Sequence, residues 1–474
     1  MRCIKSVAGV LLAGLSLSAV ACGGGAGAGI AAKDASGRTA VGNQPVSKEA
    51  AQNFDRAIDE FAAHDKKQDW QEGVCNSVAE SFLNASKEQQ SAGGKPLAEA
   101  VYNAGLAYQR CGKDAEAKAQ FESAAKIDPS MHRARAQVAL YEYQRSNDLD
   151  GAARSLDQII RDAKFQNAEA LVALAALQME RGADNADQDG KNDLERAQRN
   201  LQRALAIDDS YMPAFNQLAI YYLEQAKLKA GQVSTAPKGK RGRRGLVVAG
   251  AKKAEVNEQQ LDLAALVASQ AQRKNPNYAP IHNTTGLILV ELRNFNGAVK
   301  SFANARRLDP KFFEAHMNYA AVNLSFRGFQ EAERAYRDAL KLRSNEYEAH
   351  LGLALAVRGQ INDGNFERYV AEAQKELDQA KKLDPQRPES YYNEAILTQE
   401  FRAKRGNAVT SLEKAAQQYR EFIAKAGGDP AFADAVKRSK ERTEDIDDTI
   451  KFIKEGDQAA KDQPAPAAAP PPSK

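Results

Sequence analysis

The sequence predicts an all-α protein built from repeated pairs of helices, and three observations support this. Small and aromatic residues recur every 34 residues between Ala279 and Ser344. Only 7% of the 474 residues are aromatic and alanine is frequent throughout, a composition that suits closely packed helices better than a β-sandwich. After residue 22, no stretch of the sequence is long and apolar enough to cross a bilayer.

The recurring residue types have distinct roles in a pair of helices. Small residues let the two helices of a pair cross closely, and an aromatic residue fills the gap to the next pair. Asp-Pro ends the second helix, because proline cannot continue a helix and restricts the residue before it. One pair cannot bury its apolar face alone, so consecutive pairs are expected to stack as a solenoid. The residues that carry the pattern are Gly286, Ala298, Phe302, Ala305 and Pro310, then Ala320, Ala332, Tyr336, Ala339 and Ser344, and earlier Gly105, Ala117, Phe121, Ala124 and Pro129.

With these residue types at fixed positions of a 34-residue period, the sequence resembles the tetratricopeptide (TPR) repeat. The resemblance implies a right-handed superhelix of about eight TPR-like repeats over residues 48–430, with a basic insertion at 230–258. The highly charged segment 431–455 resembles the polar helix that caps a solenoid. Residues 456–474 are rich in alanine and proline and are expected to form a disordered tail.

The first 47 residues are typical of an exported, anchored protein. Arg2 and Lys5 precede an uncharged apolar stretch that ends at Ala21, so residues 1–21 are interpreted as a signal peptide. Small residues directly before Cys22, followed by a glycine run, resemble a bacterial lipobox, which implies cleavage before Cys22 and its acylation. Residues 22–47 are expected to be a flexible tether. The alternative is an ordinary signal peptide with an incidental cysteine.

Cys75 and Cys111 are the thiols that remain after this processing. An exported protein meets an oxidising compartment, where a pair of cysteines can form a disulfide. The two residues fall on neighbouring helices of the predicted array, although a bridge needs Cα atoms within about 7 Å. A disulfide and two buried free thiols are both compatible with the sequence.

His282, His316 and His350 are spaced by the repeat and look like a row of metal ligands. Equivalent residues of successive repeats lie on helices whose axes are about 8–10 Å apart, whereas zinc needs ligands at about 2.0–2.1 Å. We therefore favour a packing role over a metal-sensitive or pH-sensitive one, and we predict no metal site.

A basic stretch at residues 236–254 interrupts the fourth repeat and contains no acidic residue. It can contact an anionic surface or be a solvated loop. The formal net charge of the chain is only +4, which gives no case for nucleic acid. The basic residues considered for this contact are Lys238, Lys240, Arg241, Arg243 and Arg244.

The sequence lacks the motifs of common catalytic sites. It has no Gly-x-Ser-x-Gly, no phosphate-binding glycine loop and no His-Glu-x-x-His. We therefore predict no enzyme activity, no cofactor and no small-molecule substrate.

The TPR resemblance implies that positions five and nine of each first helix face an inner groove that binds other proteins. Apolar and amide side chains at these positions suit an amphipathic helix or an extended segment. The alternative is that the insertions within the repeats cover several of them. The predicted groove residues are Tyr102, Leu106, Asn216, Ile220, Asn283, Leu287, Met317, Leu351 and Leu355.

The combination of lipobox, tether, repeats and Ala/Pro tail resembles the TPR lipoproteins of the myxobacterial adventurous gliding-motility machinery. This implies a protein-interaction scaffold that is anchored to the outer membrane, with its body in the periplasm and other envelope proteins as partners. The glycine at residue 23, in place of aspartate, favours the outer membrane. The alternatives are a pilotin-like or exopolysaccharide-export lipoprotein and an adaptor for a peptidoglycan hydrolase.

Overall fold

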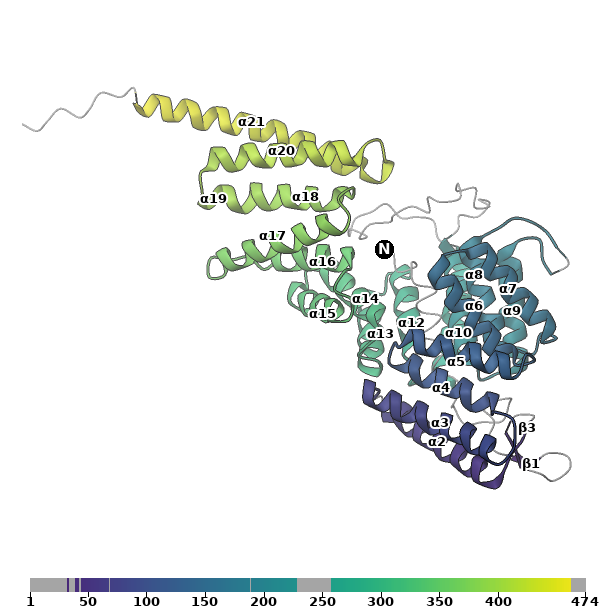
Figure 1. Ribbon diagram of the computed structural model, residues 1–474. Coiled ribbons are helices and arrows are strands. Elements are labelled where there is room, and N and C mark those ends of the chain that lie inside the picture. Colours follow the sequence, from purple (N-terminus) through teal and green to yellow (C-terminus); the bar gives the residue numbers. More distant parts are fainter. Residues whose placement is uncertain are drawn as a thin grey trace, which may run out of the picture. The chain divides into compact units, whose positions relative to one another are not determined.

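The computed structural model describes residues 32–33, 39–41, 44–67, 69–187, 189–227 and 257–461. These residues form an all-α solenoid of consecutive helix pairs, preceded by one small antiparallel sheet (Figure 1). The described chain divides into an N-terminal unit that ends at Leu292 and a C-terminal unit that begins at Arg293. Within the described ranges, no helix combines the length and apolar character that a membrane span requires.

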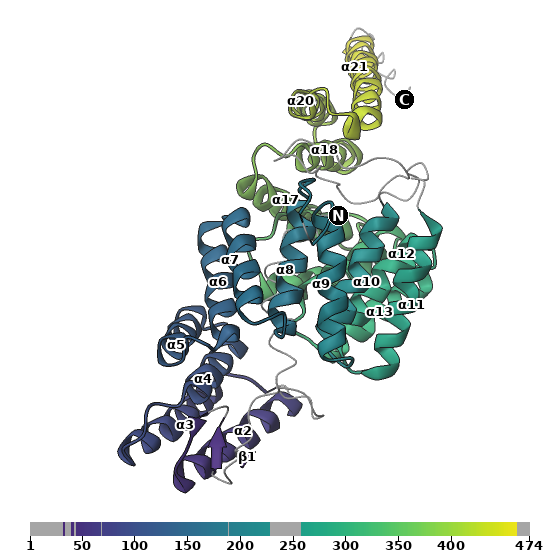
Figure 2. The ribbon, with the colours of Figure 1, turned by 90° about the vertical axis from the view of Figure 1, so that its right-hand side faces the viewer.

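The N-terminal unit contains the sheet and the first five helix pairs, followed by one further helix. Figure 2 shows α6 to α12 standing side by side. The strands are β1 (Ala32–Lys33), β2 (Thr39–Val41) and β3 (Gln44–Pro45). The helices are α2 (Lys48–Lys67), α3 (Glu72–Ser91), α4 (Ala98–Arg110), α5 (Asp114–Ile127), α6 (His132–Ser146), α7 (Leu149–Asp162), α8 (Ala168–Arg181), α9 (Asp193–Ile207), α10 (Met212–Lys227), α11 (Glu258–Lys274) and α12 (Ala279–Glu291).

The C-terminal unit continues the pairs and ends in a long helix. A short π-helix, η1 (Thr398–Arg402), interrupts the first helix of the last pair. The other elements are α13 (Phe295–Leu308), α14 (Phe313–Ser325), α15 (Phe329–Leu342), α16 (Tyr347–Arg358), α17 (Phe366–Leu383), α18 (Pro388–Leu397), α19 (Ala403–Arg405), α20 (Ala408–Ala426), the 3₁₀ turn η2 (Pro430–Phe432) and α21 (Ala433–Lys461).

The small and aromatic residues of the repeat pack as the sequence predicts. A Cβ atom at Gly105 in α4 would lie only 2.7 Å from the ring of Phe121 in α5. That ring is fully buried, and its centroid lies 6.1 Å from the ring of Tyr141 in α6. Phe121 therefore joins its own pair to the next one. In the C-terminal unit, a side chain at Gly352 would overlap the ring of Tyr336.

Five of the turns between pairs contain the same side-chain hydrogen bond. An Asp or Asn that follows the second helix accepts a hydrogen bond from the backbone N–H two residues later, which fixes a tight turn and ends the helix. Among the described turns between pairs, this bond joins Asp128 with Ser130 (2.9 Å), Asp208 with Ser210 (2.8 Å), Asn275 with Asn277 (3.0 Å), Asp309 with Lys311 (2.9 Å) and Asp384 with Gln386 (3.3 Å). The aspartate of Asp-Pro thus contributes as much to the turn as the proline.

The end of the segment predicted to be a flexible tether is folded onto the N-terminal unit. Val41 is buried in the core of this unit. The amide Nε2 of Gln44 donates to the carbonyl oxygens of Lys95 (2.9 Å) and Pro96 (3.0 Å). The backbone N–H of Ser47 donates to Gln89 at 2.8 Å. The prediction that the tether extends to residue 47 is therefore wrong, because the composition argument overlooked the buried Val41 and the anchoring Gln44.

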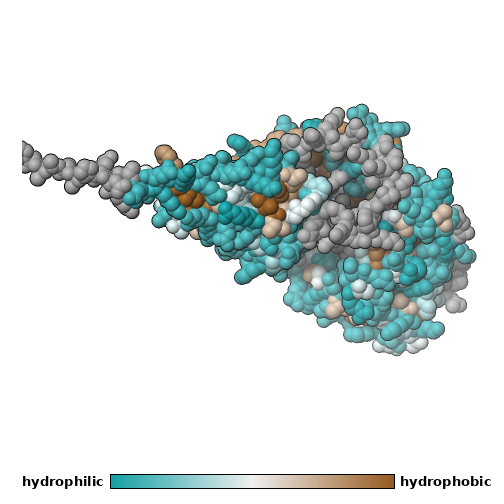
Figure 3. Space-filling model, turned by 90° about the horizontal axis from the view of Figure 1, so that it is seen from above, coloured by the Kyte–Doolittle hydropathy of each residue, from teal (hydrophilic) through white to brown (hydrophobic). Residues whose placement is uncertain are grey.

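The last helix differs from its predicted bounds of 431–455. It begins at Ala433 and continues to Lys461, into the segment predicted as a tail. Ile446 and Ile450 are buried in a cluster with side chains of α20, while Phe452 is 77% exposed. Around α21, at the left of Figure 3, the surface is mainly hydrophilic with a few small hydrophobic patches. This is typical of a helix that closes a solenoid.

The insertion between α8 and α9 is held by a buried ion cluster. The carboxylate of Asp193 is fully buried and accepts hydrogen bonds from Arg181 (2.7 Å) and Arg196 (2.6 Å). Arg196 also donates to the backbone oxygens of Asn185 (2.7 Å) and Gly190 (3.4 Å). The insertion is therefore anchored to α8 and α9.

Candidate functional site

The first helices of successive pairs contact one another and form a continuous face in each unit. We call this the first-helix face and define it by positions 2, 5, 6, 9 and 12 of α4, α6, α8, α10 and α12 in the N-terminal unit, and of α14, α16 and α18 in the C-terminal unit. Polar side chains connect these helices. Gln109 donates to Gln137 at 3.3 Å, and Gln137 donates to Glu169.

The same connection continues along the N-terminal unit. Gln217 in α10 contacts the sulfur of Met179 in α8 at 3.3 Å, and Thr284 in α12 donates to Asn216 in α10 at 2.7 Å. Each of these contacts includes a polar residue at position six of a first helix: Gln137 in α6, Gln217 in α10 or Thr284 in α12. Sequence reasoning missed this row, although a polar residue at position six recurs visibly in the sequence.

The structure buries five of the nine predicted groove residues. Tyr102, Leu106, Asn216, Asn283 and Leu351 are buried, so these five are not open contact positions. The other four are half-buried and remain candidates for contact with a partner: Ile220 and Leu287 in the N-terminal unit, and Met317 and Leu355 in the C-terminal unit.

Close approach of the first helices explains the burial of Tyr102. Its hydroxyl in α4 lies 3.4 Å from the carboxylate of Glu169 in α8, two first helices further along. The guanidinium of Arg133 in α6 lies 4.7 Å from the centroid of the Tyr102 ring and pairs with Glu99. Burial raises the pKa of Glu169 to about 7, against the opposing attraction of Arg133. This end of the first-helix face is therefore filled by its own side chains.

One side chain on this face is left unsatisfied. Asn103 in α4, at position six, is only 2% exposed. Neither atom of its amide group has a hydrogen-bond partner among the residues that the structure describes. A buried polar group without a partner costs about 1–3 kcal/mol, which favours a bound water at this point.

The three histidines at position four hold the turns that precede their helices. The Nε2 atoms of His282, His316 and His350 lie 2.7, 2.9 and 2.9 Å from the carbonyl oxygens of Pro276, Pro310 and Ser344 respectively. Each histidine therefore packs within its own turn. In the described ranges, no group of three or more possible ligands is placed to hold a metal ion.

The contacts of the second nitrogen differ between His316 and His350, and so do the directions in which their pKa values shift. Arg306 donates to Nδ1 of His316 at 2.9 Å, and burial lowers the pKa of this imidazole. Nδ1 of His350 instead lies 2.6 Å from the carboxylate of Glu376, whose hydrogen bond raises the pKa of His350. His316 is thus harder to protonate than an ordinary histidine, and His350 is easier to protonate.

Cys75 and Cys111 are joined by a disulfide in the structure, with their Cα atoms 6.3 Å apart. The bond links α3 to the residue that follows α4 and so connects the first two pairs. The signal peptide, Cys22 and the basic residues from Lys238 to Arg244 lie outside the described residues.

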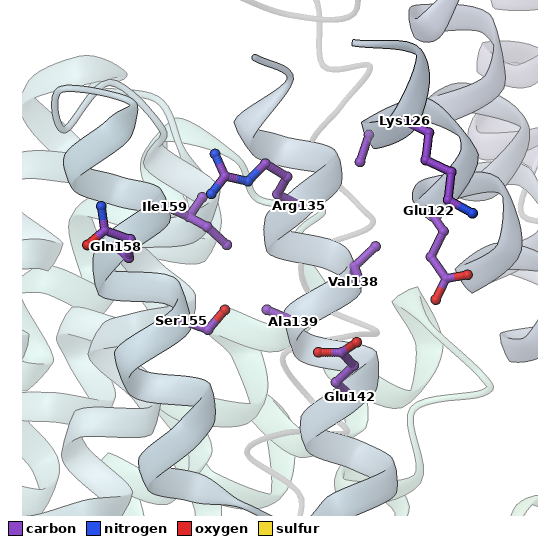
Figure 4. A pocket seen from close by; sticks show the side chains of 10 residues that line it. Glu122, Lys126, Arg135, Val138, Ala139, Glu142, Ser155, Gln158 and Ile159 are labelled. Carbon is purple, nitrogen blue, oxygen red and sulfur yellow. The ribbon is translucent and has the colours of Figure 1, made fainter. Parts of the chain in front are cut away.

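A shallow hollow of about 620 Å³ lies between α5, α6 and α7 (Figure 4). Its lining residues include no histidine or cysteine, so they do not form a nucleophile–base pair of the Ser–His or Cys–His kind. The hollow exists because Ala125 and Val138 are small. At the equivalent positions of a later repeat, Arg306 stacks on the ring of Tyr319 at 4.5 Å and fills the space.

The comparisons with known proteins agree with this class of fold. Residues 98–131, which form α4, α5 and the following turn, match the tetratricopeptide repeat family. No curated protein sequence matches the chain. The chain is thus a helical solenoid of consecutive helix pairs that contains a tetratricopeptide repeat at residues 98–131.

Several solved TPR structures resemble the chain at low identity. A thermophilic TPR protein from Thermus thermophilus is 22% identical, with 48% of this chain and 99% of that one covered and a TM-score of 0.37. PilF of Pseudomonas aeruginosa is 17% identical, with 57% and 97% covered and a TM-score of 0.39. A TPR protein of Parabacteroides merdae is 15% identical, with 66% and 98% covered and a TM-score of 0.36.

Proposed function

We propose that the protein is a scaffold that binds segments of other envelope proteins along its first-helix face. The observation that carries this proposal is the pair of half-buried apolar side chains on the first-helix face of each unit, namely Ile220 and Leu287 in the N-terminal unit and Met317 and Leu355 in the C-terminal unit. Half-buried apolar residues on a rigid helical face can anchor an amphipathic helix or extended segment.

The test is a charge substitution on this face with a matched control. Leu287→Glu and Met317→Glu should each reduce the recovery of partner proteins from crosslinked envelopes, because a buried unpaired carboxylate opposes apolar contact. Leu266→Glu is the control, because Leu266 is 52% exposed on the second helix α11. Circular dichroism should show unchanged helicity in all three variants. If the control reduces recovery as much as the other two, the binding site is not on this face.

We further propose that acyl chains on Cys22 hold the scaffold on the outer membrane, with its body in the periplasm. The support is the lipobox-like sequence that ends at Cys22. Cys22→Ala should move the protein from the membrane fraction to the soluble fraction, because the acyl chains are its proposed membrane contact. A Cys22→Ala variant that still sediments with membranes contradicts this anchor.

The partners recovered with the wild type identify the machine that the scaffold serves. Recovery of gliding-motility subunits supports a role as a scaffold of the gliding-motility machinery. Secretin or export-porin subunits, or a peptidoglycan hydrolase, select one of the alternatives.

A further inference from the structure

Arg358 is a half-buried arginine in the C-terminal unit without a carboxylate partner among the described residues. It is the last residue of α16, and its Nη1 donates to the carbonyl oxygen (3.2 Å) and the side-chain oxygen (3.0 Å) of Asn393 in α18. Both acceptors are neutral. The guanidinium group is therefore positioned by Asn393, and these two hydrogen bonds supply no counter-charge.

Two other half-buried arginines of this unit are paired. Arg306 lies 3.4 Å from Asp338, and Arg337 pairs with both Glu333 and Glu372. Such pairing is the usual arrangement, because a guanidinium removed from water without a counter-charge is unfavourable. Arg358 departs from this pattern at position 12 of its helix, on the first-helix face and three residues after Leu355.

A second arginine adds to the positive charge near Arg358. Arg442 in α21 donates to Gln399 at 2.7 Å and lies 2.9 Å from Glu400, and both of these belong to the π-helix η1. Glu400 and Arg442 also act electrostatically on Arg358. Two guanidinium groups thus face one carboxylate, which leaves one positive charge in excess. Burial lowers the pKa of Arg358, and the attraction of Glu400 does not offset this.

We propose that Arg358, positioned by Asn393 and next to Arg442, binds a carboxylate of a protein partner. The inference rests on the proposed function of the first-helix face. One excess positive charge matches one carboxylate, and a guanidinium binds a carboxylate through two parallel N–H donors. Nη1 is held by Asn393, so Nε and Nη2 form the available pair of donors. Leu355 supplies an apolar contact one helical turn away.

The probe is a set of nine-residue peptide libraries with two variables. One library has Asp or Glu at the central position and the other has Asn or Gln, and each is made with a free or an amidated C-terminus. Binding to the full chain is measured by fluorescence polarisation. The wild type should prefer the carboxylate-bearing peptides by roughly tenfold or more. If the central Asp or Glu strengthens binding, a side-chain carboxylate is bound. If the free C-terminus strengthens binding relative to the amide, the terminal carboxylate is bound.

Three variants separate the proposed carboxylate site from the proposed scaffold function of the first-helix face. Arg358→Met should abolish the preference, and Arg358→Lys should retain part of it, because lysine keeps the charge but not the two-donor geometry. Arg334→Met is the control, because Arg334 is 62% exposed and pairs with Glu331. If the peptides bind equally to the wild type and to Arg358→Met, the carboxylate site is wrong and the scaffold function stands. If no peptide binds the wild type, both proposals fail.

Discussion

Replacing Asp193 by alanine is expected to lower the free energy of unfolding by about 3–5 kcal/mol. The Asp193 carboxylate is fully buried between Arg181 and Arg196, and it also accepts the backbone N–H of Ala183 at 2.8 Å. The Arg196 side chain is only 5% exposed, so removing the carboxylate leaves a buried cation without its nearest counter-charge. Urea denaturation followed by circular dichroism measures the loss.

A matched control uses the exposed ion pair of the neighbouring helix. Asp157 in α7 pairs with Arg161 at 2.8 Å, but its side chain is 40% exposed. Asp157→Ala should therefore change the free energy of unfolding by no more than about 1 kcal/mol. Limited proteolysis between Gly182 and Asn192 should accelerate only in Asp193→Ala, because Arg196 fixes that loop. Equal losses of stability in the two variants contradict a special role for the buried cluster.

The same carboxylate gives the stabilisation a defined pH dependence. Burial alone would raise the pKa of Asp193, but hydrogen bonds from Arg181 and Arg196 hold this pKa below its ordinary value. The contribution is therefore present above the unfolded-state pKa of about 3.9 and is lost as the pH falls through the folded-state value. The stability difference between the wild type and Asp193→Asn should shrink below about pH 4 and stay constant from there to neutral pH.

The packing within repeats could be predicted because the same neighbours recur in each period. The ring of Phe121 packs directly against Gly105, so this position has no room for a larger residue. The 34-residue spacing of Gly, Ala, Phe and Pro therefore encodes helix pairing directly, without knowledge of distant residues.

The exposure of the groove residues could not be predicted in the same way, because it depends on how closely helices approach across several repeats. Tyr102 contacts Glu169, which is 67 residues away in the sequence. No local pattern reveals that contact, and the TPR resemblance alone implies an open surface there. Leu287 and Met317 remain half-buried, whereas Asn283 at the neighbouring position is buried.

The charged clusters were missed for a related reason. Asp193 and Arg358 look like ordinary polar residues of a loop edge and a helix end. Only the structure shows that Asp193 lies between two arginines and that Arg358 hydrogen-bonds to a neutral asparagine and forms no ion pair with a described carboxylate. The presence or absence of a counter-charge is a property of three-dimensional neighbours, which the sequence order does not give.

Removing the Cys75–Cys111 disulfide is expected to lower the free energy of unfolding by about 3–4 kcal/mol. The bond joins residues 36 apart in the sequence, and closing a loop of this size restricts the unfolded chain considerably. Cys75 is fully buried, so the double variant Cys75→Ala/Cys111→Ala avoids placing an unpaired hydroxyl in the core. Urea denaturation of both proteins, each carrying Cys22→Ala, measures the difference.

The loss of stability on removing the disulfide should be local, because each helix pair of a solenoid is stabilised mainly by the neighbouring pairs. The disulfide connects α3 to the end of α4, so amide hydrogen exchange should accelerate in α2 to α5 and much less in α8 to α11. Dithiothreitol should destabilise the protein that retains Cys75 and Cys111 and leave the double variant unchanged, which separates the bond from any packing effect of the substitutions. Equal stability of the oxidised protein and the double variant would mean that the bond contributes nothing to the first two pairs, and that their apolar contacts alone hold the start of the solenoid together.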